Sequence, residues 1–308
     1  MSYFKKNQTI NLILLLILPL LIWGPFFPDL IVSISSLIFL IFVFKKKLFF
    51  YFNNKPLIIF FIFCIYLVLI STFVATDILI SFESSLFYFR IGVFACLIWY
   101  LIDKDKNILK LFYYTLVLCF SILVVDGYFQ FFFGINTIGL PTNGTRISSF
   151  FGDELIMGSF LARLFPLLFA LFLLQDKKKF EIYFIGILFI LVDVLIYISG
   201  ERTAFFFLNL STLFIILLIK EHRKFRIITF VCALILISVL SLSSNEISNR
   251  MIMSPIKSMG FDQRDKDKKI FTPYHDSHIK TAINMFLDQP IFGHGPKMFR
   301  IICKEKKY

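Results

Sequence analysis

The chain has 308 residues, of which 58% are hydrophobic and only 17% charged, and 43 of them are phenylalanine. An ordinary soluble domain is about half apolar and about a quarter charged, so this composition excludes a disordered chain, a coiled coil and a small secreted disulfide scaffold. The apolar residues come in blocks of about 20 residues, the length that crosses a bilayer. The sequence therefore predicts an all-α, polytopic integral membrane protein.

Apolar blocks follow one another along the first 243 residues. Because each is near the bilayer-crossing length, we expect about nine transmembrane helices in a domain over 1–243 and a polar loop region over 244–308. The blocks lie at 10–27, 30–44, 57–75, 84–102, 108–126, 154–174, 181–198, 203–219 and 226–243.

The distribution of Lys and Arg predicts the orientation in the membrane. Half of the 32 basic residues lie at the N-terminus and in every second short loop, whereas the opposite short loops hold only Arg146 and Arg202. Basic residues favour cytoplasmic loops, so we expect a cytoplasmic N-terminus and a periplasmic 244–308 region. The formal net charge of +12 therefore reports topology, and we expect membrane lipid and no nucleic acid as a partner.

The polar region contains one amphipathic segment. Asp276 or Ser277 is placed to cap a helix that Pro290 ends, and such a helix suits a membrane surface. The turn residues 293–296 follow it. Its apolar face comprises Ile279, Ala282, Ile283, Phe286 and Leu287.

Two predicted periplasmic loops each place one arginine among small polar residues, Arg146 within 139–152 and Arg202 within 199–204. An arginine binds an anion through paired hydrogen bonds and keeps its charge at any working pH. The alternative is that each arginine reaches the interface or pairs locally, Arg202 with Glu201 for example.

Several ionisable residues lie in or near the apolar blocks, where a charged group costs about 2.5 to 3.5 kcal/mol. We expect them to face protein or a water-filled cavity. Arg90 lies almost two helical turns after Glu83, so it belongs either to a structural ion pair or to a site. The others are Asp126, Asp153, Glu154, Arg163 and Asp193.

The histidines of the polar region give a weak signal. His275 and His278 are three residues apart, but a zinc site needs about three or four protein ligands, so we expect no metal. His294 lies between two glycines, where it either occupies a turn or takes part in chemistry.

The stretch 126–152 and the Ser-Gly-Glu-Arg-Thr-Ala segment at 199–204 resemble the O-antigen ligase and O-antigen polymerase superfamily. The segment 288–296, which ends in Gly-His-Gly-Pro, is similar to a Pro-Gly segment of the same family. The resemblance covers about residues 80–300, and the arginine after Ser-Gly is its most specific part.

Members of that family are membrane glycosyltransferases with a GT-C-like helical bundle. The resemblance implies transfer of a glycan from undecaprenyl diphosphate, at the periplasmic face of the bacterial inner membrane, to a hydroxyl of lipid A core or of another glycan. Inversion of the anomeric centre without a metal or other cofactor is implied as well. The resemblance further implies that Arg146 and Arg202 bind the donor diphosphate, with Arg90 as a further candidate.

The sequence departs from the family near its end. The family's proposed base is a histidine in a His-Pro-His-Asn type segment, followed by further spans, and neither is present before Tyr308. We therefore expect a truncated chain whose base lies beyond Tyr308, with His278 and His294, and less specifically His275, as the candidates within it.

Two other functions stay open. A flippase or other transporter would use the charges within the blocks, Glu83, Arg90, Asp126 and Asp193, although the two matching halves that many transporters show are not evident. A membrane scaffold would use all charges structurally and bind a partner through 244–308.

Overall fold

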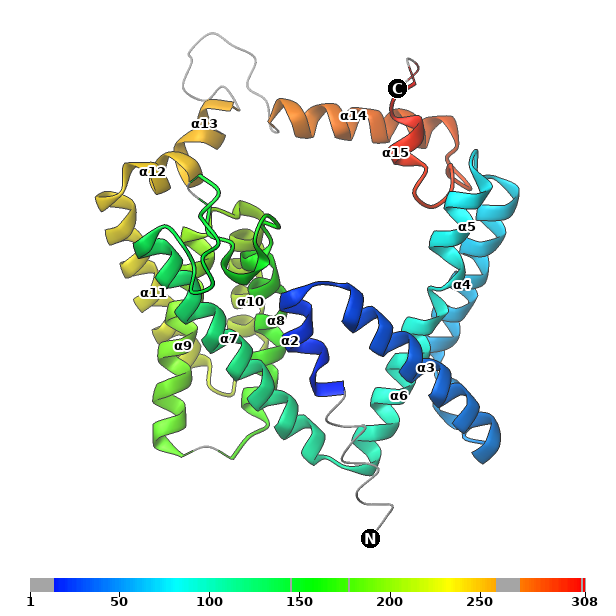
Figure 1. The fold of residues 1–308 in the computed structure, drawn as a ribbon, viewed down its shortest axis with the longest axis horizontal. Helices are drawn as coiled ribbons and strands as arrows, with labels where there is room; N and C mark the ends of the chain where they lie inside the picture. Colours follow the sequence, from blue (N-terminus) through cyan, green and yellow to red (C-terminus); the bar gives the residue numbers. More distant parts are fainter. Residues whose placement is uncertain (1–13, 145, 177, 259–271, 306, 308) are drawn as a thin grey trace. The chain divides into compact units, whose positions relative to one another are not determined.

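The computed structural model describes residues 14–144, 146–176, 178–258, 272–305 and 307. These residues form helices and no named strand (Figure 1), which confirms the predicted polytopic helical membrane fold. Helices long and apolar enough to cross a membrane are α3 (Phe26–Lys46), α4 (Lys55–Phe73), α5 with α6 (Ile78–Lys104), α7 (Asn107–Phe133), α9 (Lys179–Ile198) and α11 (Arg223–Ser243).

The predicted number of nine spans is not confirmed. Two further apolar helices, α8 (Met157–Leu173) and α10 (Arg202–Leu218), have 17 residues each. The first apolar block yields only the seven-residue α2 (Ile17–Trp23), and the rest of that block up to residue 13 lies outside the described residues. Each of these three helices is therefore shorter than any of the six candidate membrane spans.

The chain divides into two compact units. The first comprises residues 1–28 and 107–257, and the second comprises 29–106 and 258–308. The predicted division of the chain into 1–243 and 244–308 concerns its position relative to the membrane and stays a prediction.

Helices α7 to α11 of the first unit enclose an aromatic core. Phe165, Phe172 and Phe189 are fully buried, and the ring centroids of Phe165 and Phe189 are 4.9 Å apart. At Gly186 a Cβ would lie 3.2 Å from the Phe225 ring, so glycine lets α9 and α11 approach closely. Such close approach is typical of helix packing in membranes, where dispersion contacts replace the hydrophobic effect.

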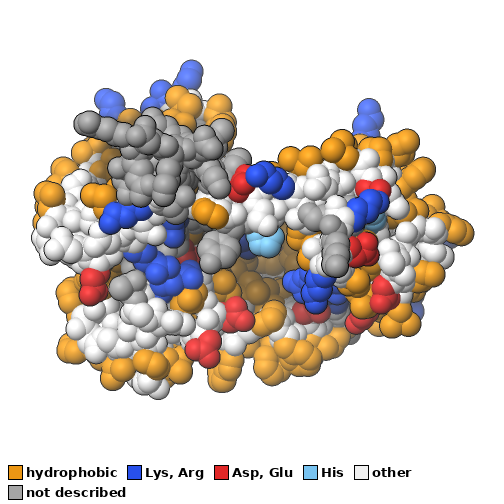
Figure 2. Space-filling model, turned by 90° about the horizontal axis from the view of Figure 1, so that it is seen from above, with side chains coloured by type: hydrophobic (Ala, Val, Ile, Leu, Met, Phe, Trp, Pro, Cys, Tyr) orange, Lys and Arg blue, Asp and Glu red, His pale blue; other side chains and the backbone are white. Residues whose placement is uncertain are grey.

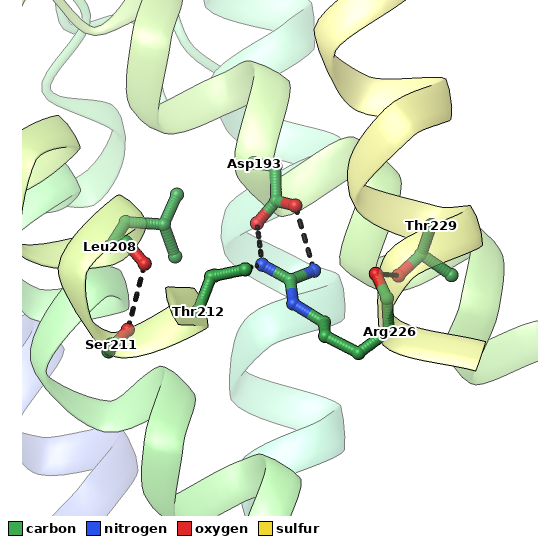
Figure 3. A network of polar contacts seen from close by, with 6 residues as sticks. All are labelled: Asp193, Leu208, Ser211, Thr212, Arg226 and Thr229. Carbon is green, nitrogen blue, oxygen red and sulfur yellow. Dashed lines mark hydrogen bonds and ion pairs between the residues drawn. The ribbon is translucent and has the colours of Figure 1, made fainter. Parts of the chain in front are cut away.

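A buried ion pair joins three of these helices (Figure 3). Arg226 donates to the two carboxylate oxygens of Asp193 at 2.8 and 3.1 Å and to the hydroxyl of Thr212 at 2.6 Å. Its guanidinium carbon lies 4.4 Å from the ring centroid of Phe165. Arg226 belongs to α11 itself, and its side chain has 0% exposure. A buried guanidinium needs such partners to offset its desolvation.

In the second unit, helix α14 (Pro273–Asp288) confirms the predicted amphipathic helix. It starts earlier than predicted because Pro273 occupies the first turn, a favoured position for a residue without an N–H. On its apolar face, Ile283 and Leu287 are exposed. The short helix α15 (Phe299–Ile302) follows, and the loop before it seats Met298 in a cluster with Ala75, Met285 and Ile302.

Candidate functional site

Polar residues near the end of α7 fix the loop that carries Arg146. Asp126, which is buried, accepts hydrogen bonds from the backbone N–H of Thr137 at 2.9 Å and from the hydroxyl of Ser149 at 2.5 Å. Asp126 thereby fastens the loop at Thr137 and at Ser149, which lie 11 and 23 residues later in the chain. Asp126 thus acts as part of the scaffold of this loop.

Gln130 continues this scaffold one turn further along α7. Its side-chain oxygen accepts the N–H groups of Ser148 and Ser149 at 3.0 and 2.7 Å, and its amide nitrogen donates to the carbonyls of Leu140 and Pro141. Ser149 has a φ of +53°, an uncommon conformation for a residue with a Cβ. The hydrogen bonds of Gln130 stabilise this strained backbone three residues after Arg146.

Arg146 is held at the edge of this loop. Its Nη2 donates to the carbonyl of Leu155 at 3.0 Å, and its backbone forms an isolated β-bridge with Asn143. The Nε of Arg146 is buried and has no hydrogen-bond partner within the part of the chain that the structure describes. The side chain is therefore positioned while part of its hydrogen-bonding capacity is unused.

Glu201 does not pair with Arg202, so the local pairing considered from the sequence is wrong. Its carboxylate accepts the N–H groups of Gly158 and Ser159 at 2.6 and 3.0 Å and the Ser159 hydroxyl at 2.7 Å. The carboxylate thus caps the N-terminus of α8, where negative charge is favourable. Gly158 is needed there because a Cβ would lie 2.7 Å from the hydroxyl of Ser199.

Arg202 is consequently left exposed at the first residue of α10. The turn before it places Gly200 at a φ of +75°, a conformation that glycine adopts without penalty. Arg202 is therefore an exposed arginine whose neighbouring carboxylate is used elsewhere.

A third arginine, Arg250, meets this turn. It lies on the π-helical turn Asn249–Met253 that follows α12 (Asn245–Ser248), and its Nε donates to the carbonyl of Gly200 at 3.2 Å. Burial and the positive charges of Arg146 and Arg202 lower the pKa of Arg250. The positive charges of Arg146 and Arg202 thus act on Arg250.

Figure 2 looks onto the end of the molecule that carries α12 and shows Lys and Arg side chains gathered there. The sequence did not single out Arg250, because it was counted with the other basic residues of the 244–308 region. Its closeness to the end of the last apolar block was the available signal.

Arg90 and His294 belong to the second unit. Both line a cavity of about 850 Å³ together with Tyr66, Glu83 and Lys297. Arg90 does not form the ion pair with Glu83 that the sequence left open. It pairs with Asp29 of α3, Nη2 to Oδ1 at 2.5 Å, and donates to the hydroxyl of Ser33 at 2.7 Å.

The candidate histidines have different surroundings. The Nε2 of His294 lies 3.1 Å from the carbonyl of Met285 and 3.7 Å from a carboxylate oxygen of Asp288. A carbonyl only accepts, so Nε2 carries the hydrogen in this contact. His278 is exposed on α14 with its ring centroid 6.3 Å from that of Phe299. His275 is also exposed on α14.

The predicted turn around His294 is confirmed. Gly293 and Gly295 both have positive φ, and a Cβ at Gly295 would lie 2.9 Å from the Cβ of Ala75. Within the described ranges, no three His, Cys, Asp or Glu side chains lie close enough to hold a metal ion.

Comparison with known proteins gives one match: the family model described as O-antigen ligase matches residues 186–307. That match, over less than half of the chain, supports the predicted family. It includes Arg202, Arg250 and His294, and Arg146 precedes it. No curated protein and no solved structure matches the chain. The match indicates a role in O-antigen or surface polysaccharide assembly, and the several long apolar helices indicate a multi-pass membrane protein.

Proposed function

We propose that this protein transfers a glycan from undecaprenyl diphosphate to an acceptor hydroxyl at the periplasmic face of the bacterial inner membrane. The observation that carries the proposal is that Arg250 donates to the carbonyl of Gly200, in the turn that leads into Arg202 at the start of α10. The loop after α7 holds Arg146, whose positive charge, like that of Arg202, lowers the pKa of Arg250. Arginines grouped beside partly buried backbone form a typical site for a phosphorylated ligand.

The arrangement suits a diphosphate leaving group. Glycosyl transfer places negative charge on the diphosphate oxygen as its bond to the sugar breaks, and preorganised guanidinium groups stabilise such charge without reorganisation. Glu201 is turned toward the N-terminus of α8, so the acidic residue next to Arg202 is engaged elsewhere. The acceptor is a hydroxyl of lipid A core or of another glycan repeat, and the transfer inverts the anomeric centre.

The charge pattern supports the periplasmic assignment. Arg146 follows α7 and Arg202 opens α10 directly after α9, which puts both in the loops that hold few basic residues. Basic residues in such loops are disfavoured by the orientation rule, so their presence there calls for a function. A lipid-linked glycan that is presented at the same membrane face meets this requirement.

A flippase or other transporter is less well supported. Two of the carboxylates that motivated this hypothesis form hydrogen bonds within the chain. Asp126 accepts from the hydroxyl of Ser149, and Asp193 accepts from Arg226. These contacts fasten a loop and join helices, so they account for both carboxylates without a transport pathway.

Alanine substitution of Arg202 or Arg146 in the producing cell tests the proposed function. We expect surface polysaccharide on a gel to fall by at least about tenfold, equivalent to about 1.4 kcal/mol of transition-state stabilisation. Lys179→Ala, an exposed cation at the start of α9, is the matched control and should leave the ladder unchanged. A full ladder from an Arg202→Ala strain with normal protein levels would refute the proposal.

A further inference from the structure

Arg250 lies directly against the turn that presents Arg202. Besides the hydrogen bond from its Nε to the carbonyl of Gly200, its side chain occupies the space that a Cβ on Gly200 would need, 2.8 Å from the Arg250 Cδ. Arg250 comes from the segment after α11, whereas Arg146 comes from the loop after α7. Arg250 and Arg202 are therefore brought together from separate parts of the chain, and the charge of Arg146 also acts on Arg250.

The proposed reaction changes the charge of the ligand. A glycan-linked lipid diphosphate is esterified at both ends and carries two negative charges. When the acceptor oxygen bonds to the anomeric carbon, the bond from that carbon to the diphosphate oxygen breaks and its electron pair stays on the diphosphate. The acceptor's proton passes to a base or to water, and the released lipid diphosphate carries up to three charges, since the second pKa of a phosphate monoester is about 6.

We propose that Arg250 binds the diphosphate oxygen that gains charge as the glycan leaves, whereas Arg146 and Arg202 hold the two charges already present in the donor. This inference rests on the proposed function. An interaction made mainly in the transition state raises kcat rather than donor affinity. Arg250 therefore acts on turnover and on product binding.

The surroundings of Arg250 favour this assignment over a purely donor-binding one. Arg146 is fixed by a loop that Asp126 and Gln130 scaffold, and Arg202 is an exposed residue on α10. The charged form of Arg250 is disfavoured by burial and by the other two guanidinium groups. Held against the carbonyl of Gly200 beside Arg202, Arg250 is placed to bind an additional negative charge that develops at this turn.

Binding to two farnesyl ligands tests the inference with the purified full chain in nanodiscs. Farnesyl diphosphate represents the product with its extra charge, and farnesyl-diphosphoryl-N-acetylglucosamine represents the donor. For Arg250→Ala we expect the affinity for farnesyl diphosphate to fall by at least about tenfold. The affinity for farnesyl-diphosphoryl-N-acetylglucosamine should fall by less than about threefold. Arg202→Ala should weaken both by about tenfold or more.

Two further variants separate charge from structure. Lys257→Ala removes an exposed cation on the following helix α13 (Ser254–Ser258) and should change neither affinity. Arg250→Lys keeps the charge but replaces the Nε donor to Gly200, so we expect it to retain the preference for farnesyl diphosphate that Arg250→Ala loses. It also serves as the test variant if Arg250→Ala does not fold.

The outcomes distinguish the two proposals. If Arg250→Ala weakens the binding of both ligands equally, or weakens neither, the role of Arg250 is overturned while the proposed function stays intact. If the unmodified protein binds neither ligand, or if Arg202→Ala binds both normally, the proposed function itself fails. In a turnover assay, a lowered kcat with donor KM within about threefold supports the inference, and a raised KM with unchanged kcat contradicts it.

Discussion

The ion pair of Asp193 and Arg226 gives a quantitative test of the packing of the first unit. Both side chains are at most 1% exposed, and the pair also engages Thr212 of α10. Replacing Arg226 by Met leaves a buried carboxylate without its cation, and replacing Asp193 by Leu leaves a buried guanidinium without its anion. Each single change should lower the free energy of unfolding by about 3 to 5 kcal/mol.

The double variant Asp193→Leu, Arg226→Met removes both charges together. Apolar residues of similar volume often replace a buried pair with little loss, and the site is already lined by the rings of Phe165, Phe189 and Phe230. We therefore expect the double variant to lie within about 1 kcal/mol of the unmodified protein, which corresponds to a coupling of several kcal/mol between the two positions.

Denaturant titration of the detergent-solubilised protein, followed by tryptophan fluorescence, measures these differences. Lys224→Leu, an exposed residue on the same helix α11, is the control for added apolar surface and should change the midpoint little. A double variant whose loss equals the sum of the two single losses would refute the reasoning, because the two charges would then be independent of each other.

Two predictions concern the scaffold of the arginines. Gly200→Ala places a Cβ at a φ of +75° and against Arg250, so we expect a loss of about 1 to 3 kcal/mol in unfolding free energy together with a loss of polysaccharide transfer, and a variant that keeps both would contradict the described turn. Gln130→Leu leaves the N–H groups of Ser148 and Ser149 without their acceptor, so we expect about 1 to 3 kcal/mol lower stability and faster proteolysis within 134–152, and unchanged cleavage there would show that the loop is held by other contacts.

The sequence predicted the helical membrane fold well because long apolar blocks report it directly. It was less informative about span length. The block around α8 counts as apolar beyond both ends of the helix, yet α8 begins only at Met157, where the carboxylate of Glu201 caps it. Apolar composition does not show where such a tertiary cap ends a helix, so the number of spans could not be settled from composition.

The candidate site was predicted in part. Arg146 and Arg202 stood out because the orientation rule disfavours basic residues in their loops. In the structure Arg250 contacts the turn before Arg202, and the charges of Arg146 and Arg202 lower the pKa of Arg250. Arg250 itself lies in a segment where basic residues are common, so its charge carried no signal. The partners of Arg90 and Glu201 could not be found from local spacing, because each lies more than 30 residues away along the chain.

The carboxylates of the first unit suggest why its arginines suit a ligand. Asp193 binds the guanidinium of Arg226, Asp126 holds a loop, and Glu201 caps α8. These three carboxylates are thus committed to backbone groups, a hydroxyl or a buried cation, so none of the three neutralises Arg146 or Arg202. If Asp126 or Glu201 were free to turn toward an arginine, part of the positive charge of the site would be neutralised internally and its affinity for a diphosphate would fall. The same hydrogen bonds that stabilise the fold therefore also maintain the positive charge on which the proposed transfer depends.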